Sequence, residues 1–235
     1  MIEIHNLEKK YDGDVLFKDV NITFLKSDIS FLVGKNGVGK TTLMTILAGL
    51  LDFEQGDIEI DGRLLELPYQ QSIRKQIFLL PTDNISIDYL TATENLSYYA
   101  KLYHIDVNTV VIDEILKEYQ LKQEEKKLVV EYSTGMKKRL DLAILELISP
   151  EILLLDEPSL GLDVYHVDFL KRKLMDYKKQ NKTIIVTSHD MSLANKVSDK
   201  VFLFKDKNIE VYNSVDVDLE AIILQSYQDV RGGEK

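Results

Sequence analysis

The sequence of 235 residues contains no cysteine, which excludes disulfide bonds, cysteine-ligated zinc sites and thiol catalysis. Only 4 prolines and 11 glycines are present, and no stretch rich in them divides the chain. No apolar run approaches the roughly 20 residues that a membrane-spanning helix needs. The first residues lack the basic and apolar regions of a secretory signal. We therefore expect one compact domain, over about residues 1–230, located in the cytoplasm.

Positive charge is scarce relative to negative charge, and the formal net charge is -10. Hydrophobic residues make up 45% of the chain and charged residues 29%, which is typical of a globular protein. Because binding to nucleic acid is usually driven by Lys and Arg, we expect no nucleic-acid partner. Lys137-Lys138-Arg139 is a local basic run. We interpret it as the solvated face of a helix, and a basic binding patch is the alternative.

Apolar and β-branched runs alternate with helical patterns, which predicts an α/β fold with a parallel sheet. The expected strands are 28–33, 77–80, 151–155, 183–187 and 201–205. A helix with Leu43, Ile46 and Leu47 on one face follows the first strand, and 164–180 form another helix that Asn181 ends.

Between residues 82 and 149 the strand pattern disappears, and three helices are expected. The first is opened by Thr91 and Glu94, which match a capping box. The others are expected over 109–119 and 134–148, so this region is interpreted as a helical subdomain inserted between core segments 1–81 and 150–215. Near the N-terminus, 2–7, 20–25 and 58–60 are expected as antiparallel strands, with a turn at Asp61–Gly62. A C-terminal helix is expected over about 217–229, and a mobile tail over 231–235.

The segment Gly34-Lys35-Asn36-Gly37-Val38-Gly39-Lys40-Thr41 matches the phosphate-binding pattern G-x-x-x-x-G-K-[ST] between a strand and a helix. Its glycines let backbone N–H groups turn towards phosphate oxygens, and the helix start adds partial positive charge. Lys40 is expected to contact the β- and γ-phosphates, and Thr41 to bind Mg²⁺. The expected nucleotide-binding residues of this segment are Gly34, Asn36, Gly37, Gly39, Lys40, Thr41 and Thr42.

Asp156 and Glu157 end the apolar strand 151–155, where ligands bind in parallel sheets. Asp156 is expected to hold Mg²⁺ through water, and Glu157 to polarise an attacking water. A phosphate loop and a carboxylate pair indicate a nucleoside triphosphatase, but such residues are shared by kinases, GTPases and motors.

Tyr132-Ser133-Thr134-Gly135-Met136 resembles the signature sequence of ATP-binding-cassette (ABC) ATPases, in the variant found in many exporters. The resemblance extends from about Ile2 to Gln228 and implies a P-loop NTPase core of the RecA-like type that hydrolyses ATP with Mg²⁺. It implies that Ser133 and Gly135, at a helix start, form an anion site that faces the γ-phosphate held by a second subunit.

The same resemblance implies roles for three further residues. Asp163, in the segment 158–163, would reach across the dimer. His189 would contact the γ-phosphate and hold the attacking water with Glu157. Tyr11 would stack on adenine.

Two positions depart from the family pattern: Thr134 stands where a glycine is usual, and Thr82 where a glutamine is usual. The glutamine approaches Mg²⁺, whereas a threonine hydroxyl is shorter, so we expect Thr82 to act on the metal through a water. Asp83, or less plausibly Gln76, is the alternative for this role.

The resemblance implies a head-to-tail dimer with an identical chain or a close paralogue, which drives an integral membrane permease. The cassette would be peripheral on the cytoplasmic face, and an exporter is expected. A group of aromatic and apolar residues after Thr82 is expected either to receive a helix of the membrane subunit or to fill the helical core. Its members are Ile85, Ile87, Tyr89, Leu90, Tyr98, Tyr99 and Tyr103. The alternative function is a soluble assembly or regulatory ATPase; the cargo is not readable.

Overall fold

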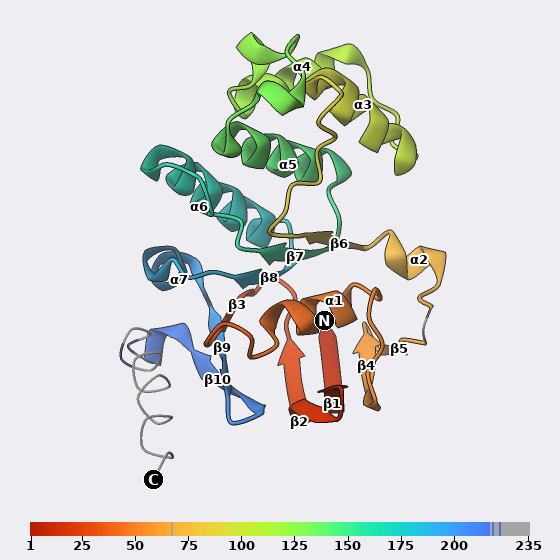
Figure 1. Ribbon diagram of the computed structural model, residues 1–235, viewed down its shortest axis with the longest axis vertical. Helices are drawn as coiled ribbons and strands as arrows, with labels where there is room; N and C mark the ends of the chain where they lie inside the picture. Colours follow the sequence, from red (N-terminus) through yellow and green to blue (C-terminus); the bar gives the residue numbers. More distant parts are fainter. Residues whose placement is uncertain (67, 217, 219–220, 222–235) are drawn as a thin grey trace.

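The computed structural model describes residues 1–66, 68–216, 218 and 221, and its elements form two β-sheets with helices between and around them (Figure 1). The smaller sheet is antiparallel and has the order β2-β1-β4-β5, with strands β1 (Ile2–Tyr11), β2 (Asp14–Phe24), β4 (Gln55–Ile60) and β5 (Arg63–Leu64). The larger sheet has the order β10-β9-β3-β8-β7-β6, with strands β3 (Ile29–Val33), β6 (Ile77–Leu80), β7 (Ile152–Asp156), β8 (Thr183–Thr187), β9 (Lys200–Lys205) and β10 (Asn208–Asn213).

The central strands β3, β8 and β7 are buried along their whole length. Their side chains alternate between two hydrophobic clusters. Phe31 and Leu153 point into the cluster on one face of the sheet, whereas Leu32 and Leu154 point into the cluster on the other face. Parallel strands that are covered on both faces appear in a sequence as continuous apolar runs. This explains why the sequence marks these strands clearly.

Helix α1 lies between the two sheets, and Leu43 and Met44 join it to the antiparallel sheet (Figure 1). Helices α6 and α7 cover the opposite face of the large sheet through residues such as Leu170 and Leu193. The short helix α2 precedes β6. The bounds of these helices are α1 (Lys40–Leu47), α2 (Gln71–Arg74), α6 (Val164–Lys179) and α7 (Met191–Val197).

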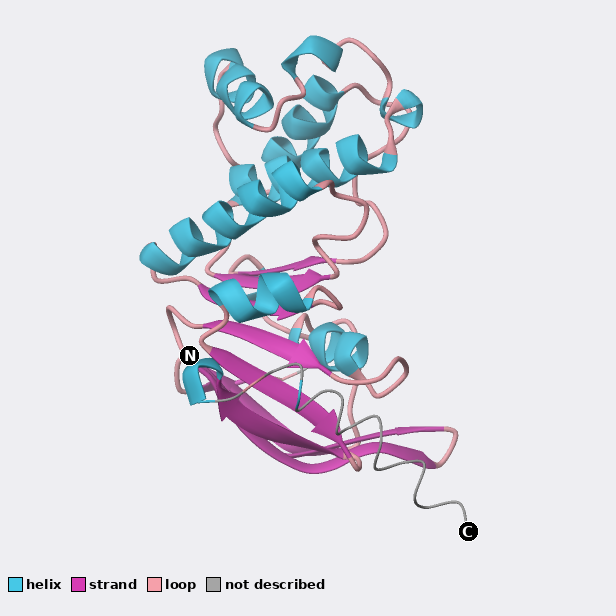
Figure 2. Ribbon diagram, turned by 90° about the vertical axis from the view of Figure 1, so that its left-hand side faces the viewer, coloured by secondary structure: helices cyan, strands magenta, loops and turns pink. Residues whose placement is uncertain are grey.

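The chain between β6 and β7 forms a helical region at one end of the molecule (Figure 2). Its elements are α3 (Ala92–Leu102), α4 (Thr109–Glu118), the 3-10 turns η1 (Lys122–Glu124) and η2 (Val129–Glu131), and α5 (Thr134–Ile148). The capping box is present: Glu94 N donates to Thr91 Oγ1 at 3.2 Å, and Thr91 N donates to Glu94 Oε2 at 2.8 Å. Helix α5 packs on α3 and α4, and their buried side chains belong to the same hydrophobic cluster as one face of the large sheet.

The structure confirms the α/β fold class, the antiparallel N-terminal sheet and the helical insertion. It also confirms the turn at Asp61–Gly62, where φ values of 50° and 73° suit a tight hairpin. The five predicted strands of the large sheet are all parallel, as expected, and the sheet gains β10, an edge strand that was not predicted and pairs antiparallel with β9. The numerical division into core and helical units stays a prediction. The expected helix over 217–229, apart from residues 218 and 221, and the expected tail over 231–235 lie outside the described residues.

The interpretation of Lys137-Lys138-Arg139 as a solvated helix face is wrong. Lys137 forms an ion pair with Asp88, and Arg139 donates to backbone carbonyls at the end of α4 at 3.0 and 3.1 Å. Lys138 is only 2% exposed. The run joins α5 to its neighbours, because a helix packed on several sides has no fully solvated face.

Candidate functional site

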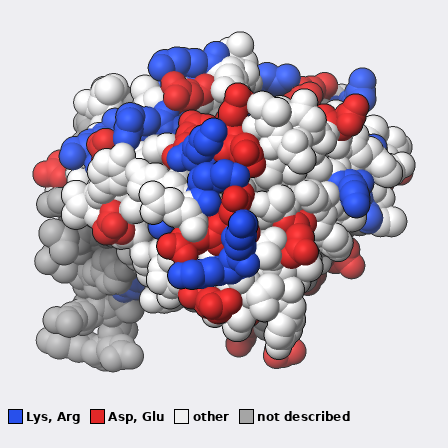
Figure 3. Space-filling view, turned by 90° about the horizontal axis from the view of Figure 1, so that it is seen from above, with Lys and Arg blue, Asp and Glu red and all other residues white. Residues whose placement is uncertain are grey.

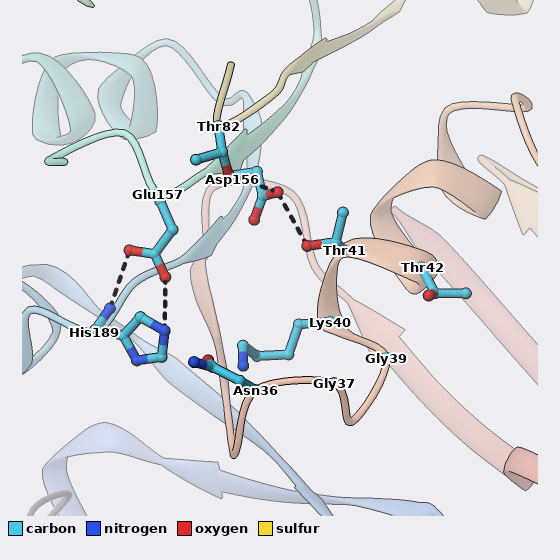
Figure 4. Close-up of a pocket in the computed structure, with 10 residues that line it drawn as sticks. All are labelled: Asn36, Gly37, Gly39, Lys40, Thr41, Thr42, Thr82, Asp156, Glu157 and His189. Carbon is cyan, nitrogen blue, oxygen red and sulfur yellow. Dashed lines mark hydrogen bonds and ion pairs between the residues drawn. The ribbon is translucent and has the colours of Figure 1, made fainter. Parts of the chain in front are cut away.

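The carboxyl ends of four neighbouring parallel strands, β3, β8, β7 and β6, meet at one edge of the large sheet. Ligands of open α/β sheets bind at such an edge. A pocket of about 320 Å³ lies there, between the end of the sheet and the start of α1 (Figure 4). Its lining consists of Asn36, Gly37, Gly39, Lys40, Thr41, Thr42, Thr82, Asp156, Glu157 and His189.

The loop between β3 and α1 has an unusual backbone, because Gly34, Gly37 and Gly39 have φ values of 145°, 81° and 107°. A Cβ atom at Gly39 would also lie 2.9 Å from Leu16 Cδ2, so the Leu16 side chain would have to shift. These glycines therefore allow the loop to curl before the helix begins.

Helix α1 begins at Gly39 without a side-chain cap. By contrast, a side chain caps the first turn of α3, α4, α5, α6 and α7. The first amides of a helix have no partner within the helix, and at α1 they face the pocket. A phosphate group is the ligand that such amides and the helix dipole favour.

Lys40 lies over this loop and is 9% exposed. Its Nζ atom donates to the carbonyls of Gly34 at 2.8 Å and Lys35 at 2.9 Å. Burial lowers the pKa of Lys40, and the carboxylates of Glu157 and Asp156 oppose this shift. The geometry therefore holds a cation at the mouth of the anion-binding loop, where its carbonyl partners can be exchanged for phosphate oxygens.

The Asp156 carboxylate accepts hydrogen bonds from hydroxyl groups on three segments of the chain. Thr41 Oγ1 and Thr82 Oγ1 each donate to Asp156 Oδ2 at 3.0 Å, and Thr187 Oγ1 donates to Oδ1. Carboxylate and hydroxyl oxygens suit a hard cation such as Mg²⁺. Among the described residues, no group of three or more acidic, His or Cys side chains is arranged to hold a metal ion, so a metal here would take further ligands from phosphate and water. The donor set fits Mg²⁺ bound together with a nucleotide.

Glu157 is held in a left-handed backbone conformation, with φ 49°. Its N–H donates to Thr187 Oγ1 at 3.0 Å and to Thr187 O at 3.2 Å, and these bonds stabilise that conformation. His189 Nε2 lies 3.3 Å from Glu157 Oε1, and His189 N donates to Oε2 at 3.2 Å (Figure 4). Strained backbone of this kind costs on the order of 1–3 kcal/mol and clusters at functional sites. The result is an oriented carboxylate that can accept a proton from water.

Three other predicted site residues, Tyr11, Ser133 and Asp163, are not among the residues that line this pocket. Tyr11, at the end of β1, is 47% exposed, and Lys9 Nζ lies 5.1 Å from the centre of its ring. Ser133 caps α5, since its hydroxyl accepts from the N–H of the residue three positions on at 3.3 Å. Asp163 caps α6 by accepting from His166 N at 2.9 Å. Thr42 lines the pocket, but its side chain points away from Lys40 and Asp156 (Figure 4).

The segments that carry Ser133 and Asp163 adjoin each other. A Cβ atom at Gly135 would lie 3.1 Å from Gly161 O, and one at Gly161 would lie 3.0 Å from Thr134 Cγ2. The start of α5 and the loop before α6 therefore form one surface, separate from the phosphate pocket of the same chain.

Two residues that support the site from outside its lining are absent from the predicted site residues. Thr187 bonds both Asp156 and Glu157, although a β-branched residue at a strand end indicates only a strand. Lys138 donates to Thr82 O at 3.1 Å and approaches Pro81 O at 3.4 Å. The sequence places Lys138 in a basic run, which gives no signal of burial.

A family model described as ABC transporter matches residues 17–160, which is more than half of the chain. The chain belongs to the ABC transporter family. It is an ATP-binding subunit that hydrolyses ATP, and the matched range includes the loop between β3 and α1.

Several known proteins are similar to this ABC subunit. The bacitracin transport ATP-binding protein BcrA of Bacillus licheniformis is 35% identical over 202 residues, which cover 86% of this chain and 65% of that protein. The lantibiotic transport ATP-binding protein SrtF of Streptococcus pyogenes is 30% identical over 210 residues, with 89% of each chain covered.

Solved structures agree with the fold of this ABC subunit. An ATP-binding subunit of an ABC transporter has a TM-score of 0.85 at 22% identity, covering 97% of this chain and 99% of that one. A dimeric ATP-binding cassette bound to ADP and phosphate has a TM-score of 0.79 at 21% identity, covering 91% and 99%. In the described part of the ABC subunit, no helix has the length and apolar character required to cross a membrane.

Proposed function

We propose that this chain is the motor of an exporter and works as a head-to-tail dimer with a second cassette and a separate membrane subunit. The observation that carries the dimer is the division of the predicted site. The phosphate pocket is assembled within one chain, whereas Ser133, Gly135 and Asp163 lie on a separate surface. In a head-to-tail dimer, the second chain would bring that surface to the γ-phosphate.

The composition of the surface supports this arrangement. Leu160, Val164 and Tyr165, beside Asp163, are 55%, 88% and 57% exposed. Exposed apolar and aromatic side chains that gather at one place are typical of a protein interface. Their burial in a dimer would remove this apolar surface from water.

The pocket residues have complementary tasks in ATP hydrolysis. The loop amides and Lys40 would bind the phosphates, and Glu157, oriented by His189, would take a proton from the attacking water. Thr41 and Asp156 would hold Mg²⁺, with Thr82 beside them, and the ion would stabilise the charge on the phosphate oxygens. Closure by the second chain would exclude bulk water, which strengthens these electrostatic interactions.

The helical region offers a surface for the membrane subunit. Tyr89 is 81% exposed and Tyr98 is 45% exposed. Tyr99 instead donates to Ile85 O at 2.7 Å and packs with Tyr103 against the core. The expected aromatic group is therefore divided between the core and the surface, and the exposed members are available to a partner.

Charges near the helical end do not form a broad surface of one sign. Seen from that end, Lys and Arg alternate with Asp and Glu in a strip, and neutral areas flank it (Figure 3). A partner would therefore be recognised there mainly through apolar and aromatic contacts. Transport outwards is supported by the similarity to ATP-binding proteins of bacitracin and lantibiotic transport.

Purification of the native protein in a mild detergent tests this function. An integral membrane protein should accompany the cassette and change its ATPase rate. Tyr89→Glu and Tyr98→Glu should reduce this association, whereas Val211→Glu, at a side chain 45% exposed on β10, serves as the control. Recovery of the native cassette without any membrane protein would instead support a soluble assembly or regulatory ATPase.

A further inference from the structure

We propose that Lys138 is a positioning residue, which ties the backbone of Pro81–Thr82 to α5 and so holds the Thr82 hydroxyl against Asp156. Lys138 does not line the phosphate pocket. Its action would be exerted through Thr82. The inference rests on the proposed function in one respect, namely that Asp156 binds Mg²⁺ together with the nucleotide.

The position of Lys138 is unusual for a lysine. It lies in the second turn of α5, is 2% exposed, and is among the largest fully buried side chains. Its Nζ atom donates to Thr82 O at 3.1 Å and approaches Pro81 O at 3.4 Å. Removing an ammonium group from water costs several kcal/mol unless polar partners replace the water. The two carbonyls and nearby carboxylates are the partners that this cation has.

Thr82 connects the buried cation with the candidate metal site. Its carbonyl accepts from Lys138, and its hydroxyl donates to Asp156 Oδ2 at 3.0 Å. Two consecutive hydrogen bonds therefore join α5 to the carboxylate. Any loss of the first bond frees the backbone from which the Thr82 hydroxyl extends.

Neighbouring residues of α5 hold the same segment, which follows β6 and has little regular structure. Asp141, one turn further along α5, accepts from Ser86 N at 3.0 Å, and Lys137 pairs with Asp88. Backbone groups outside helices and sheets need such partners when they are buried. Lys138 is the anchor nearest to the pocket.

Two opposing effects act on the charge of Lys138. Burial lowers the pKa of Lys138, and the carboxylates of Asp141, Asp156 and Asp83 oppose that shift. The positive charge lies beside the Thr82 carbonyl and partly compensates the carboxylates of the pocket. Groups that orient a metal ligand without touching the metal commonly affect metal affinity by about 10- to 100-fold.

The chain contains a matched lysine without a link to the pocket. Lys182 is 7% exposed, and its Nζ atom donates to Pro150 O at 2.9 Å and Ser149 Oγ at 2.7 Å. These acceptors follow the other end of α5 and are not among the residues that line the pocket. Lys182→Met therefore removes a comparable buried contact and controls for a purely structural effect.

The test measures binding of a fluorescent, non-hydrolysable ATP analogue with EDTA and during titration with Mg²⁺. For Lys138→Met we expect affinity in EDTA within about threefold of the parent, and a half-saturating Mg²⁺ concentration raised by about 10-fold or more. Lys138→Gln, which keeps a donor but no charge, should lose less. Lys182→Met should keep the Mg²⁺ response of the parent, and Thr82→Val should add little to Lys138→Met.

The outcomes distinguish a failure of the role of Lys138 from a failure of the Mg²⁺ site at Asp156. A parent protein whose binding responds to Mg²⁺, combined with Lys138 variants that respond equally, would overturn the role of Lys138 and leave the proposed function intact. A parent without any response to Mg²⁺ would overturn the metal site and this inference with it. If Lys138→Met does not fold, the test uses Lys138→Gln and Thr82→Val. An unchanged Mg²⁺ response in both of these variants would contradict the inference.

Discussion

The starts of α1 and α5 are both candidate anion sites, and they differ in how their first amides are satisfied. At α1 no side chain caps the helix, and the amides face a pocket that also contains Lys40 and Asp156. At α5 the hydroxyl of Ser133 accepts a hydrogen bond from one of those amides, and the residues there do not line the pocket. Unsatisfied amides favour binding of an anion, whereas a capped helix is stable without one. The start of α1 is therefore prepared to bind an anion within the single chain, whereas the start of α5 is stabilised by its own cap and would meet an anion only when a second chain brings one.

Loss of the carboxylate at Glu157 should affect the α1 side most. General-base catalysis contributes about 10²- to 10⁴-fold, so Glu157→Gln should bind ATP, accumulate as a dimer and hydrolyse ATP slower by a factor in that range. Phosphate release measures the rate of hydrolysis, and light scattering in the presence of ATP measures the accumulation of the dimer. Glu151→Gln, at the opposite end of β7, is the matched control. Hydrolysis by Glu157→Gln within about threefold of the parent rate would contradict the assignment.

Ser133→Ala tests the α5 side. Loss of this cap should destabilise the fold by about 1 kcal/mol, and Asn108→Ala, which removes the cap of α4, should cost a similar amount. Only Ser133→Ala should also lower the ATPase rate, because only that hydroxyl is expected to face the nucleotide of a second chain. ATP binding to the single chain should stay unchanged in both. Equal ATPase rates in the two variants, at equal stability, would show that Ser133 is only a cap.

Thr82→Gln changes the link between the two sides. The hydroxyl bond to Asp156 disappears, and a longer amide takes its place. We expect nucleotide affinity within about threefold, which is less than about 1 kcal/mol, because Lys40 and the loop amides dominate it. The basal ATPase rate should rise or depend less on the membrane partner. Titration of ATPase activity with Mg²⁺ is carried out on Thr82→Gln and Asp83→Ala together. Loss of the Mg²⁺ dependence only in Asp83→Ala would show that Asp83, and not Thr82, acts on the metal.

The anchor at Asp141 should give stability a small pH dependence. Burial raises the pKa of Asp141 to about 6, while Lys138 acts in the opposite direction. The folded state therefore keeps this proton at a higher pH than the unfolded state does. Stability from Asp141 is full at about pH 4 and declines as the pH rises through about 6, by at most a few kcal/mol.

Asp141→Asn removes that decline, so its free energy of unfolding relative to the parent should increase between pH 4.5 and 7. Urea unfolding at both values measures it, and Asp168→Asn, at an exposed side chain of α6, is the control. A difference between parent and Asp141→Asn that does not vary with pH would show that Asp141 titrates normally.

Elements with strong local patterns could be predicted from the sequence alone. Helix α5 and strand β6 occupy the predicted residues, and Thr91 opens α3 with the predicted capping box. Strands β5 and β10 escaped prediction because they lie at sheet edges: both residues of β5 are exposed, and β10 buries mainly Ile209. An edge strand forms because a neighbour offers its backbone, which the sequence of the strand does not record.

The predicted pocket residues come together because each motif ends a strand of the same parallel sheet. Their individual roles stay predictions. Thr187 could not be identified in this way, since its bonds to Asp156 and Glu157 depend on β8 lying beside β7. The burial of Lys138 likewise depends on how α5 is placed on the segment after β6. Local patterns thus reveal the chemistry of the loops, and only the order of the strands reveals their contacts.

Buried lysines bond to the chain near both ends of α5, so the helix can transmit a movement from one end to the other as a rigid body. Lys138 fastens its first turns to the segment after β6, and Lys182 fastens the residues just beyond its last turn to the start of β8. At about 1.5 Å per residue, the 15 residues of α5 form a rod about 22 Å long. A rod of that length that pivots by about 5° at one end carries the other end about 2 Å. A pivot of that size about the end held by Lys182 would therefore shift the Lys138 end, next to Thr82, by about the distance that breaks a hydrogen bond.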